Sequence, residues 1–350
     1  MKEMRISLDL AELWLYYIAK GKTVNVFDVG YDDPDSRWAK GDLVKVGLQL
    51  DGTGHPEFCA ENLTQKRLLS VVPEKPEIGH GFKKCFFPHR LLRAEMPGKR
   101  RLGRQGEPSS DIAKCNYQCQ NPYHRYSLLV KEPFCVMTLP TGRIWALYYN
   151  FAPFEEEGHL LWLPARFSGT ALVLPHFPQI MTKEFLEDVM VLFQGSRGFL
   201  YFFNSIHAGA TQHHFHYQLI YVGEEILPIE KANSFIDGGY DFLDGYPIKG
   251  LIFGCASGPD LIWHCIDRFQ QNAIPFNMIM VRDKIFLIPR NPDHEIVEEF
   301  QFGVLASVEI AGRLILSDRK NFEEATYEKV ENAFKKSGLE RSEIVRLIRQ

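Results

Sequence analysis

The hydrophobic pattern from residue 115 onward predicts a series of short strands. Apolar, aromatic and β-branched residues gather in short runs, and Pro and Gly lie between the runs, as is usual for strands joined by turns. Thr141 and Gly142 suit a tight hairpin turn between two of these runs. We expect strands at residues 126–130, 134–139, 144–151, 160–163, 199–203 and 213–222.

Helical spacing occurs between and after these strands. Phe185, Val189 and Leu192 fall on one face of a helix that Thr182 can cap at its N-terminus. Helices are expected at residues 182–193, at 261–271 and, as a charged pair broken near Gly338, at 322–349.

The second half of the chain repeats this layout in outline. Residues 276–281 and 284–289 have the pattern of a hairpin, and residues 303–316 that of a further strand. The region 146–166 resembles 275–290, because in each an Asn in or at the end of a strand is followed by a strand that ends in Pro and Arg. Strands and helices with hairpin-length connections predict an α+β fold with a mainly antiparallel sheet and flanking helices.

These patterns divide the chain into three regions. Residues 1–110, which are rich in turns, are expected to form an N-terminal accessory region. Residues 111–232 would form one half of the main fold and residues 233–350 the other half. The 350 residues are enough for one large or two ordinary domains, each with its own core.

Charge and cysteine content restrict the partners and the compartment. The net charge of −4 creates no field that would draw the protein to nucleic acid or to an anionic membrane. The seven cysteines are odd in number and scattered, which favours reduced thiols and a cytoplasmic protein. The apolar run at residues 10–19 is too short to cross a bilayer and is expected to be an amphipathic surface helix.

The segment around His216 carries the most specific chemistry. On a strand, His214, His216 and Gln218 would share one side, and Phe215 with its apolar neighbours would face the core. A row of two imidazoles and an amide is costly to bury, so it should face a cleft. The preceding loop of small residues suits a phosphate, and its candidate contacts are Asn204, Ser205, Gly209, Ala210 and Thr211.

Two other readings of the histidines stay open from the residues alone. Adjacent histidines on a strand could form a zinc site that His159 or a cysteine completes. They could also be a surface cluster without a role. The Gln two residues after His216 and the small-residue loop before it favour phosphorus chemistry over both.

Two motifs that follow one another along the chain resemble the histidine-triad (HIT) superfamily. The His-x-His-x-Gln form of the second motif resembles the transferase branch of that superfamily. The first motif runs from Asn150 through Pro153, Gly158 and His159 to Pro164, and the second from Asn204 through Gly209 and Thr211 to His214, His216 and Gln218. Within that branch, residues 227–230, 276–289 and 309–326 are most similar to the GDP-hexose phosphorylases. The resemblance covers about residues 112–350 and implies a fold of two HIT-like halves.

The resemblance also implies a mechanism. His216 would attack the α-phosphorus of a GDP-sugar and expel hexose 1-phosphate, and inorganic phosphate would then release GDP from the guanylyl-histidine. Gln218 would hydrogen-bond a nonbridging oxygen, and His214 would orient the site. The loop residues named above would hold the phosphates, and Asn150 and His159 would lie near the same pocket.

The resemblance leaves three further questions open. Some relatives bind zinc, for which Cys115, Cys119, His159 and His214 are the candidate ligands, although the Cys-x₃-Cys spacing is unusual and no cofactor is required. The enzymatic alternative is a diadenosine polyphosphate phosphorylase or another nucleotidyltransferase of this branch. The non-enzymatic alternative is a nucleotide- or metal-binding protein. Small-molecule substrates are the expected partners, and a homodimer is compatible with the resemblance.

Overall fold

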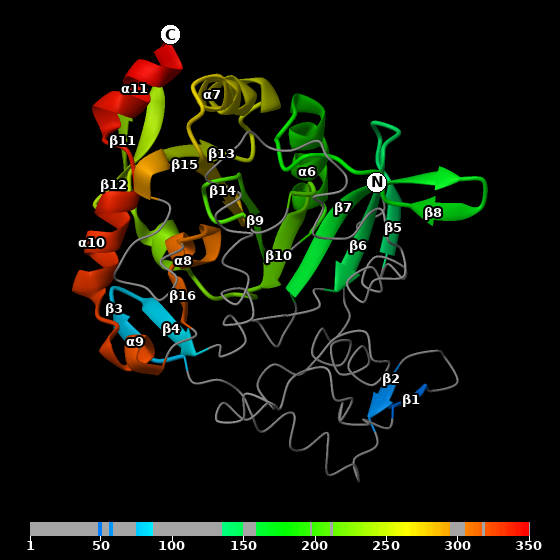
Figure 1. The fold of residues 1–350 in the computed structure, drawn as a ribbon, viewed down its shortest axis with the longest axis horizontal. Coiled ribbons are helices and arrows are strands. Elements are labelled where there is room, and N and C mark those ends of the chain that lie inside the picture. The colour runs from blue at the N-terminus through cyan, green and yellow to red at the C-terminus, as the bar shows by residue number, and fades with distance from the viewer. Residues whose placement is uncertain are drawn as a thin grey trace.

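The computed structural model describes residues 48–50, 56–58, 75–86, 135–149, 159–196, 198–210, 213–294, 305–316 and 319–349. A large antiparallel sheet occupies the centre of the molecule (Figure 1). Its strands in chain order are β5 (Cys135–Thr138), β6 (Ile144–Tyr149), β7 (His159–Ser168), β8 (Ala171–Val173), β9 (Phe199–Asn204), β10 (Tyr217–Tyr221), β11 (Asn233–Asp237), β12 (Tyr240–Asp244), β13 (Leu251–Gly254), β14 (Phe276–Val281) and β15 (Lys284–Pro289).

The strand order of this sheet has an internal symmetry. The strands lie in the order β11-β12-β13-β15-β14-β9-β10-β7-β6-β5, with β8 paired to β7. Two helices, α6 (Lys183–Gln194) and α7 (Pro259–Gln271), follow β8 and β13 in the chain. Apart from β8, each half therefore runs through three strands, a helix and two more strands with the same neighbours, and the halves meet where β9 pairs with β14. The predicted α+β fold with two similar halves is confirmed.

The repeat is aligned differently from the sequence prediction. The strand order equates β6 and β7 with β12 and β13, and β9 and β10 with β14 and β15. The expected match of 146–166 with 275–290 instead compares β6 and β7 with β14 and β15, so it is wrong. Short Asn, Pro and Arg signals recur in hairpins of any kind and do not fix which hairpin is equivalent to which.

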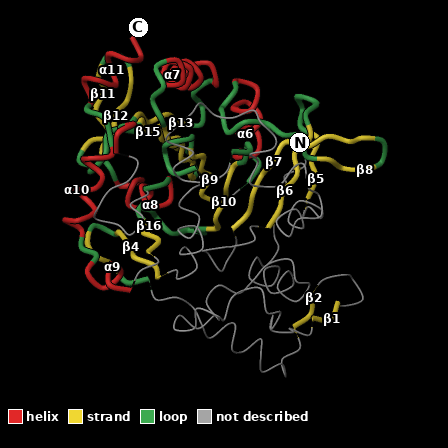
Figure 2. The backbone as a smooth tube through the Cα atoms, viewed as in Figure 1, coloured by secondary structure: helices red, strands yellow, loops and turns green. Residues whose placement is uncertain are grey.

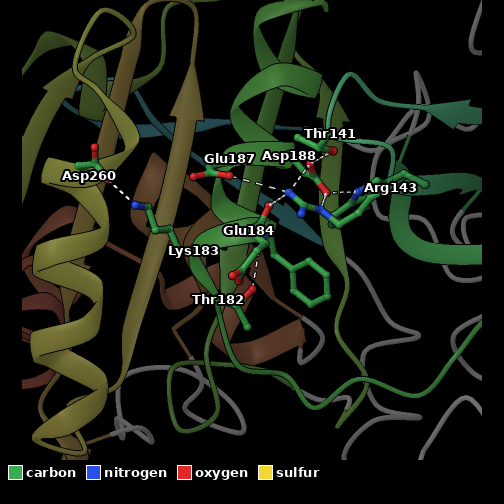
Figure 3. A network of polar contacts seen from close by, with 10 residues as sticks. Thr141, Arg143, Thr182, Lys183, Glu184, Glu187, Asp188 and Asp260 are labelled. Carbon is green, nitrogen blue, oxygen red and sulfur yellow. Dashed lines mark hydrogen bonds and ion pairs between the residues drawn. The ribbon is translucent and has the colours of Figure 1, made fainter.

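The helix α6 forms where the pattern predicts it and covers one face of the sheet. The Thr182 hydroxyl accepts a hydrogen bond from the Phe185 N–H at 3.2 Å, as an N-cap does. Below the cap, the buried Asp188 carboxylate accepts hydrogen bonds from the β5–β6 hairpin, namely from Thr141, Arg143 and Trp145 (Figure 3). This attaches the hairpin to the helix.

The central strand β9 is buried on both faces, and its residues alternate between two cores. Tyr201 and Phe203 lie in the larger core, under α6, α7 and α11 (Arg341–Arg349). Leu200 and Phe202 lie in the second core, which α8 (Ser307–Ala311) and α10 (Tyr327–Ser337) cover. A near-continuous apolar strand of this kind is expected when both faces of a sheet are packed.

A small second sheet joins distant parts of the chain. Strand β16 (Arg313–Leu316) pairs parallel with β4 (Phe82–Phe86), which pairs antiparallel with β3 (Glu77–Gly79). The helices α8, α9 (Arg319–Glu324) and α10 gather around β4 and β16 (Figure 2). The predicted division of the chain into three regions stays a prediction, although strands from the first region contact the C-terminal part here.

The predicted strand at 303–316 is wrong where α8 forms. The Glu309 carboxylate accepts from the Ala306 N–H at 3.0 Å, so a side chain satisfies a donor at the helix start. The remaining elements are β1 (Leu48–Leu50), which pairs with β2 (Pro56–Phe58), and the 3₁₀ turns η5 (Pro228–Lys231) and η6 (Pro292–His294). Within the described ranges, every helix is too short or too polar to cross a membrane.

Candidate active site

The segment that carries His216 enters the sheet later than predicted. Strand β10 begins at the residue after His216, so the predicted strand 213–222 is wrong at its N-terminal end. Before that point, the Phe215 N–H donates to the Phe177 carbonyl at 2.8 Å. The side chain of Gln179 accepts from the His216 N–H at 3.0 Å and donates to the His216 carbonyl at 3.3 Å. A side-chain amide therefore takes the place of a neighbouring strand.

The predicted alternation holds for the apolar side of the segment, in spite of the late start, whereas the expected place of the His214 ring beside His216 and Gln218 is wrong. Phe215, Tyr217 and Leu219 are fully buried in the core under α6. Burial holds the pKa of the Tyr217 phenol well above its usual value, so this side chain stays neutral. Gln218 points away from that core and is half-buried. The apolar side chains fix the segment to the core, and Gln218 on the opposite side can contact other polar groups.

Hydrogen bonding fixes the proton on the His216 ring. Its Nδ1 lies 2.8 Å from the backbone carbonyl oxygen of His214. Because a carbonyl oxygen can only accept, Nδ1 must carry the proton, and the lone pair of the neutral ring is then on Nε2. This tautomer is the one in which Nε2 can attack phosphorus.

A one-way chain of hydrogen bonds continues from His216. The Gln218 Nε2 lies 3.3 Å from the His216 Nε2, and the Gln218 Oε1 lies 3.0 Å from the His159 Nε2. The amide nitrogen can only donate and the amide oxygen can only accept. His159 therefore donates to Gln218, and Gln218 donates to His216. The structure brings these three predicted site residues together.

This polar chain occupies a gap between two apolar clusters on one face of the sheet. His159 pairs in register with Ile220, which belongs to the core under α8. Next to Gln218 on the other side is Leu161, which belongs to a small separate cluster on β6 and β7. His159 and His216 are 0% and 4% exposed. Buried polar side chains of this kind need hydrogen-bond partners, and the bonds that join His159, Gln218 and His216 supply them.

The predicted phosphate loop is held mainly by the second half of the chain. The Ser205 hydroxyl accepts from the Phe276 N–H at 2.8 Å, next to a backbone bond from Ser205 to Phe276 at 3.0 Å. Gly209 has φ +93°, and a Cβ there would lie 2.8 Å from the Ala306 Cβ. Both its conformation and its contact therefore require glycine. Ala210 follows and is half-buried.

Residues of the second half of the chain also hold the side-chain amide of Asn204. Its Oδ1 accepts from the Asn277 Nδ2 at 2.7 Å, from the Ser307 N–H at 3.0 Å and from the Ser307 hydroxyl at 2.6 Å. The Gln179 side chain donates to the Asn204 backbone carbonyl at 3.0 Å. Asn204 is thus a rigid part of the site.

His214 contributes its backbone to the site and turns its ring elsewhere. Its carbonyl holds His216, while its buried ring packs edge-on against the ring of His176, with the centroids 5.3 Å apart. Among the described residues, no group of three or more His, Cys, Asp or Glu side chains could hold a metal ion. Cys115 and Cys119 lie outside those residues, as do Asn150 and Thr211, so the zinc set stays a prediction.

Sequence reasoning missed the residues that support the site. Gln179 lies in a stretch between Pro178 and Ile180 that has no periodicity, and its role depends on where the chain folds back. Asn277 was detectable as a polar residue inside an apolar strand. A buried amide in such a strand requires a partner, which is the signal that could have identified it.

Comparison with known proteins finds related sequences for part of the chain. Residues 241–347 match the family described as GDPGP1-like, C-terminal domain. The chain is 29% identical over 198 residues to GDP-L-galactose phosphorylase 1 of Arabidopsis thaliana, and 30% identical over 202 residues to GDP-L-galactose phosphorylase 2 of the same plant. Each match covers 51% of this chain. The chain is related to the GDP-hexose phosphorylases.

The relationship to the GDP-hexose phosphorylases that the motifs predicted is thus confirmed. The matched region spans less than half the length of either relative, 43% of the first and 44% of the second. Among solved structures, yeast Ap4A phosphorylase Apa2 is similar at a TM-score of 0.51 and 16% identity, over 77% of this chain and 87% of that chain. This similarity confirms the fold of the present chain and says nothing about the substrate of the present chain.

Proposed function

We propose that this chain is a GDP-hexose phosphorylase that acts on a GDP-sugar of the GDP-glucose or GDP-galactose type. The observation that carries the proposal is the hydrogen bond between the His216 Nδ1 and the His214 carbonyl, because it places the lone pair of the neutral ring on Nε2, the atom that would attack phosphorus. The sequence similarity to two GDP-L-galactose phosphorylases supports the class of substrate.

The first step would be attack of the His216 Nε2 on the α-phosphorus. The N–P bond forms, the bond from the α-phosphorus to the bridging oxygen breaks, and hexose 1-phosphate leaves with the electron pair. The ring becomes cationic as the bond forms, and the His214 carbonyl next to Nδ1–H stabilises this charge. The leaving group is already a phosphate ester anion, so it needs no strong general acid.

Gln218 would change partner during this step. At present its Nε2 donates to the same His216 lone pair that would attack, at 3.3 Å. When phosphorus approaches that lone pair, the amide is free to donate to a nonbridging oxygen instead, where negative charge develops. The bond from His159 to the Gln218 Oε1 keeps the NH₂ group directed at the reacting atoms.

In the second step, an oxygen of inorganic phosphate would attack the phosphorus of guanylyl-His216. The new P–O bond forms, the N–P bond breaks and the electron pair returns to Nε2. GDP leaves, and the starting tautomer of His216 is restored. The expected cytoplasmic location and homodimer remain predictions of the same proposal.

Intact-mass analysis tests the proposal. The protein is mixed with GDP-glucose in the absence of phosphate, and a guanylyl adduct is expected that His216→Ala lacks and that phosphate removes with release of GDP. His264→Ala is the matched control, because this histidine lies on α7 and its Nε2 donates to the Ile348 carbonyl at 2.9 Å. It should label as the unmodified protein does.

A panel of substrates distinguishes the alternatives. An adduct with diadenosine tetraphosphate and none with GDP-sugars would replace the proposal by a dinucleoside polyphosphate phosphorylase. Absence of an adduct with every nucleotide sugar and dinucleotide would overturn both enzymatic readings.

A further inference from the structure

A buried polar network crosses from the C-terminal half into the candidate site. The Arg290 Nη1 donates to the Asn277 Oδ1 at 2.8 Å, and the Asn277 Nδ2 donates to the Asn204 Oδ1 at 2.7 Å and to the Ala208 carbonyl at 2.7 Å. Arg290 and Asn277 are both 0% exposed, and Asn204 is 4% exposed. Asn277 and Asn204 are direct partners where β14 pairs with β9.

The network has a fixed direction because it begins at an arginine. A guanidinium can only donate, so the Asn277 oxygen must face Arg290 and its NH₂ group must face Asn204. The Asn204 oxygen must then face Asn277, and the N–H of Ser307 imposes the same orientation. The Asn204 Nδ2 is therefore turned to the opposite side, and none of the hydrogen bonds among the described residues uses it as a donor.

The position of this amide is next to His216. Strands β9 and β10 pair Gln218 with Phe202, and the same register continued by two residues brings His216 opposite Asn204. Gln179 bridges the two at this point, because its Nε2 donates to the backbone carbonyls of both. The Gln179 amide lies between the two backbones here and holds both, so the Asn204 and His216 side chains lie on either side of it. A phosphoryl group on the His216 Nε2 would lie within reach of Asn204.

We propose that Asn277 and Arg290 are positioning residues that set Asn204 Nδ2 as a hydrogen-bond donor to a nonbridging oxygen of the transferred phosphoryl group. This rests on the proposed nucleotidyl transfer to His216. Residues of the C-terminal half would thereby determine that Asn204, in the other half, donates to the phosphoryl group and does not accept from it. A preorganised donor of this type acts most strongly as charge develops, so it should affect the rate of transfer more than substrate binding.

The substitution Asn277→Asp tests the direction of the network. A carboxylate keeps an acceptor for Arg290 but has no hydrogen to give to Asn204. The new carboxylate then faces the Asn204 oxygen as one acceptor against another, so the amide is no longer held with its NH₂ group directed at the phosphoryl group. We expect the rate of guanylyl-His216 formation to fall roughly a hundredfold, as for loss of one oxyanion donor, with a much smaller change in the Kd for GDP-sugar. Ser307→Ala, which removes one bond to Asn204 without reversing it, should cause a far smaller loss.

A double-mutant cycle separates positioning from general damage. In an Asn204→Ala background there is no amide to orient, so Asn277→Asp should have little further effect on the rate. An equal loss in both backgrounds would overturn the inference. If Asn277→Asp does not fold, Asn277→Ala, which has no hydrogen to give to Asn204, replaces it in the same cycle. Absence of labelling in the unmodified protein would instead refute the proposed function, so the two failures are distinguishable.

Discussion

The buried carboxylate of Asp188 should be one of the larger single contributors to the stability of the N-terminal half of the sheet. Its Oδ1 accepts from the Thr141 hydroxyl at 2.7 Å and from the Arg143 Nη2 at 2.9 Å. Its Oδ2 accepts from the Arg143 Nε at 2.5 Å and from the Trp145 Nε1 at 2.8 Å. Asp188→Asn keeps the shape but replaces one acceptor oxygen by an NH₂ group. At the Oδ2 position this group would face two donors, and at the Oδ1 position it would face the Arg143 Nη2, because only the Thr141 hydroxyl can accept.

The expected cost follows from burial. Asp188 is fully buried, whereas the Arg143 side chain is 33% exposed and can turn toward water when its partner is lost. Breaking a buried ion pair costs about 3–5 kcal/mol, and the exposure of the arginine places this case at the lower end, about 3 kcal/mol. For a chain of 350 residues, this corresponds to a fall in Tm of roughly 4 °C.

Urea and thermal unfolding, followed by circular dichroism, measure this difference. The matched control is Lys183→Ala at the start of the same helix, which removes the ion pair from Lys183 to Asp260 at 2.6 Å (Figure 3). Those side chains are 42% and 80% exposed, so the control should change the free energy of unfolding far less than Asp188→Asn does. The reasoning is refuted if Asp188→Asn destabilises the protein no more than the control does.

Two further predictions concern the site and the junction of the small sheet. Gln179→Met should lower the free energy of unfolding by about 2–3 kcal/mol, because it leaves the buried His216 N–H without its acceptor. The same substitution should slow guanylyl-adduct formation. Adduct formation at the rate of the unmodified protein would show that the contact between Gln179 and His216 is not needed for catalysis. Burial alone raises the pKa of the Glu225 carboxyl, but the hydrogen bonds and charges of Lys83 and Arg313 outweigh it, so the folded-state pKa lies below the usual 4.5. The resulting stabilisation is present above that value and is lost as the pH falls through the lower folded-state pKa. Urea unfolding should therefore show a gap between the unmodified protein and Glu225→Gln at pH 7 that shrinks at acid pH; a constant gap would contradict this.

Local patterns predicted the elements that local chemistry determines. The helix α6 has its N-cap Thr182 and its apolar face where the spacing placed them. The hairpin of β14 and β15 was predicted with both strands at their observed bounds, since each is an apolar run with a turn between. The facing of Phe215, Tyr217 and Leu219 was also predictable, because alternation needs only the side chains themselves.

The parts that depend on distant partners were not predictable. The start of β10 is delayed because the Gln179 side chain pairs with the His216 backbone, and this contact joins residues 37 positions apart. The orientation of Asn204 is set by residues 73 and 103 positions later. The pattern around Asn204 suggested a phosphate contact, but nothing near it in sequence indicates which atom of its amide faces the site.

The two halves of the sheet differ most in one connection. Between β9 and β10 the chain leaves the sheet for residues 205–216, whereas between β14 and β15 it turns through Arg282 and Asp283 alone. The second half therefore has no segment in which a nucleophile with its phosphate loop could be accommodated at the equivalent place. Each chain would therefore accept one nucleotide adduct, on the first half. The second half would not take part in the chemistry and would instead orient the residues of the first half.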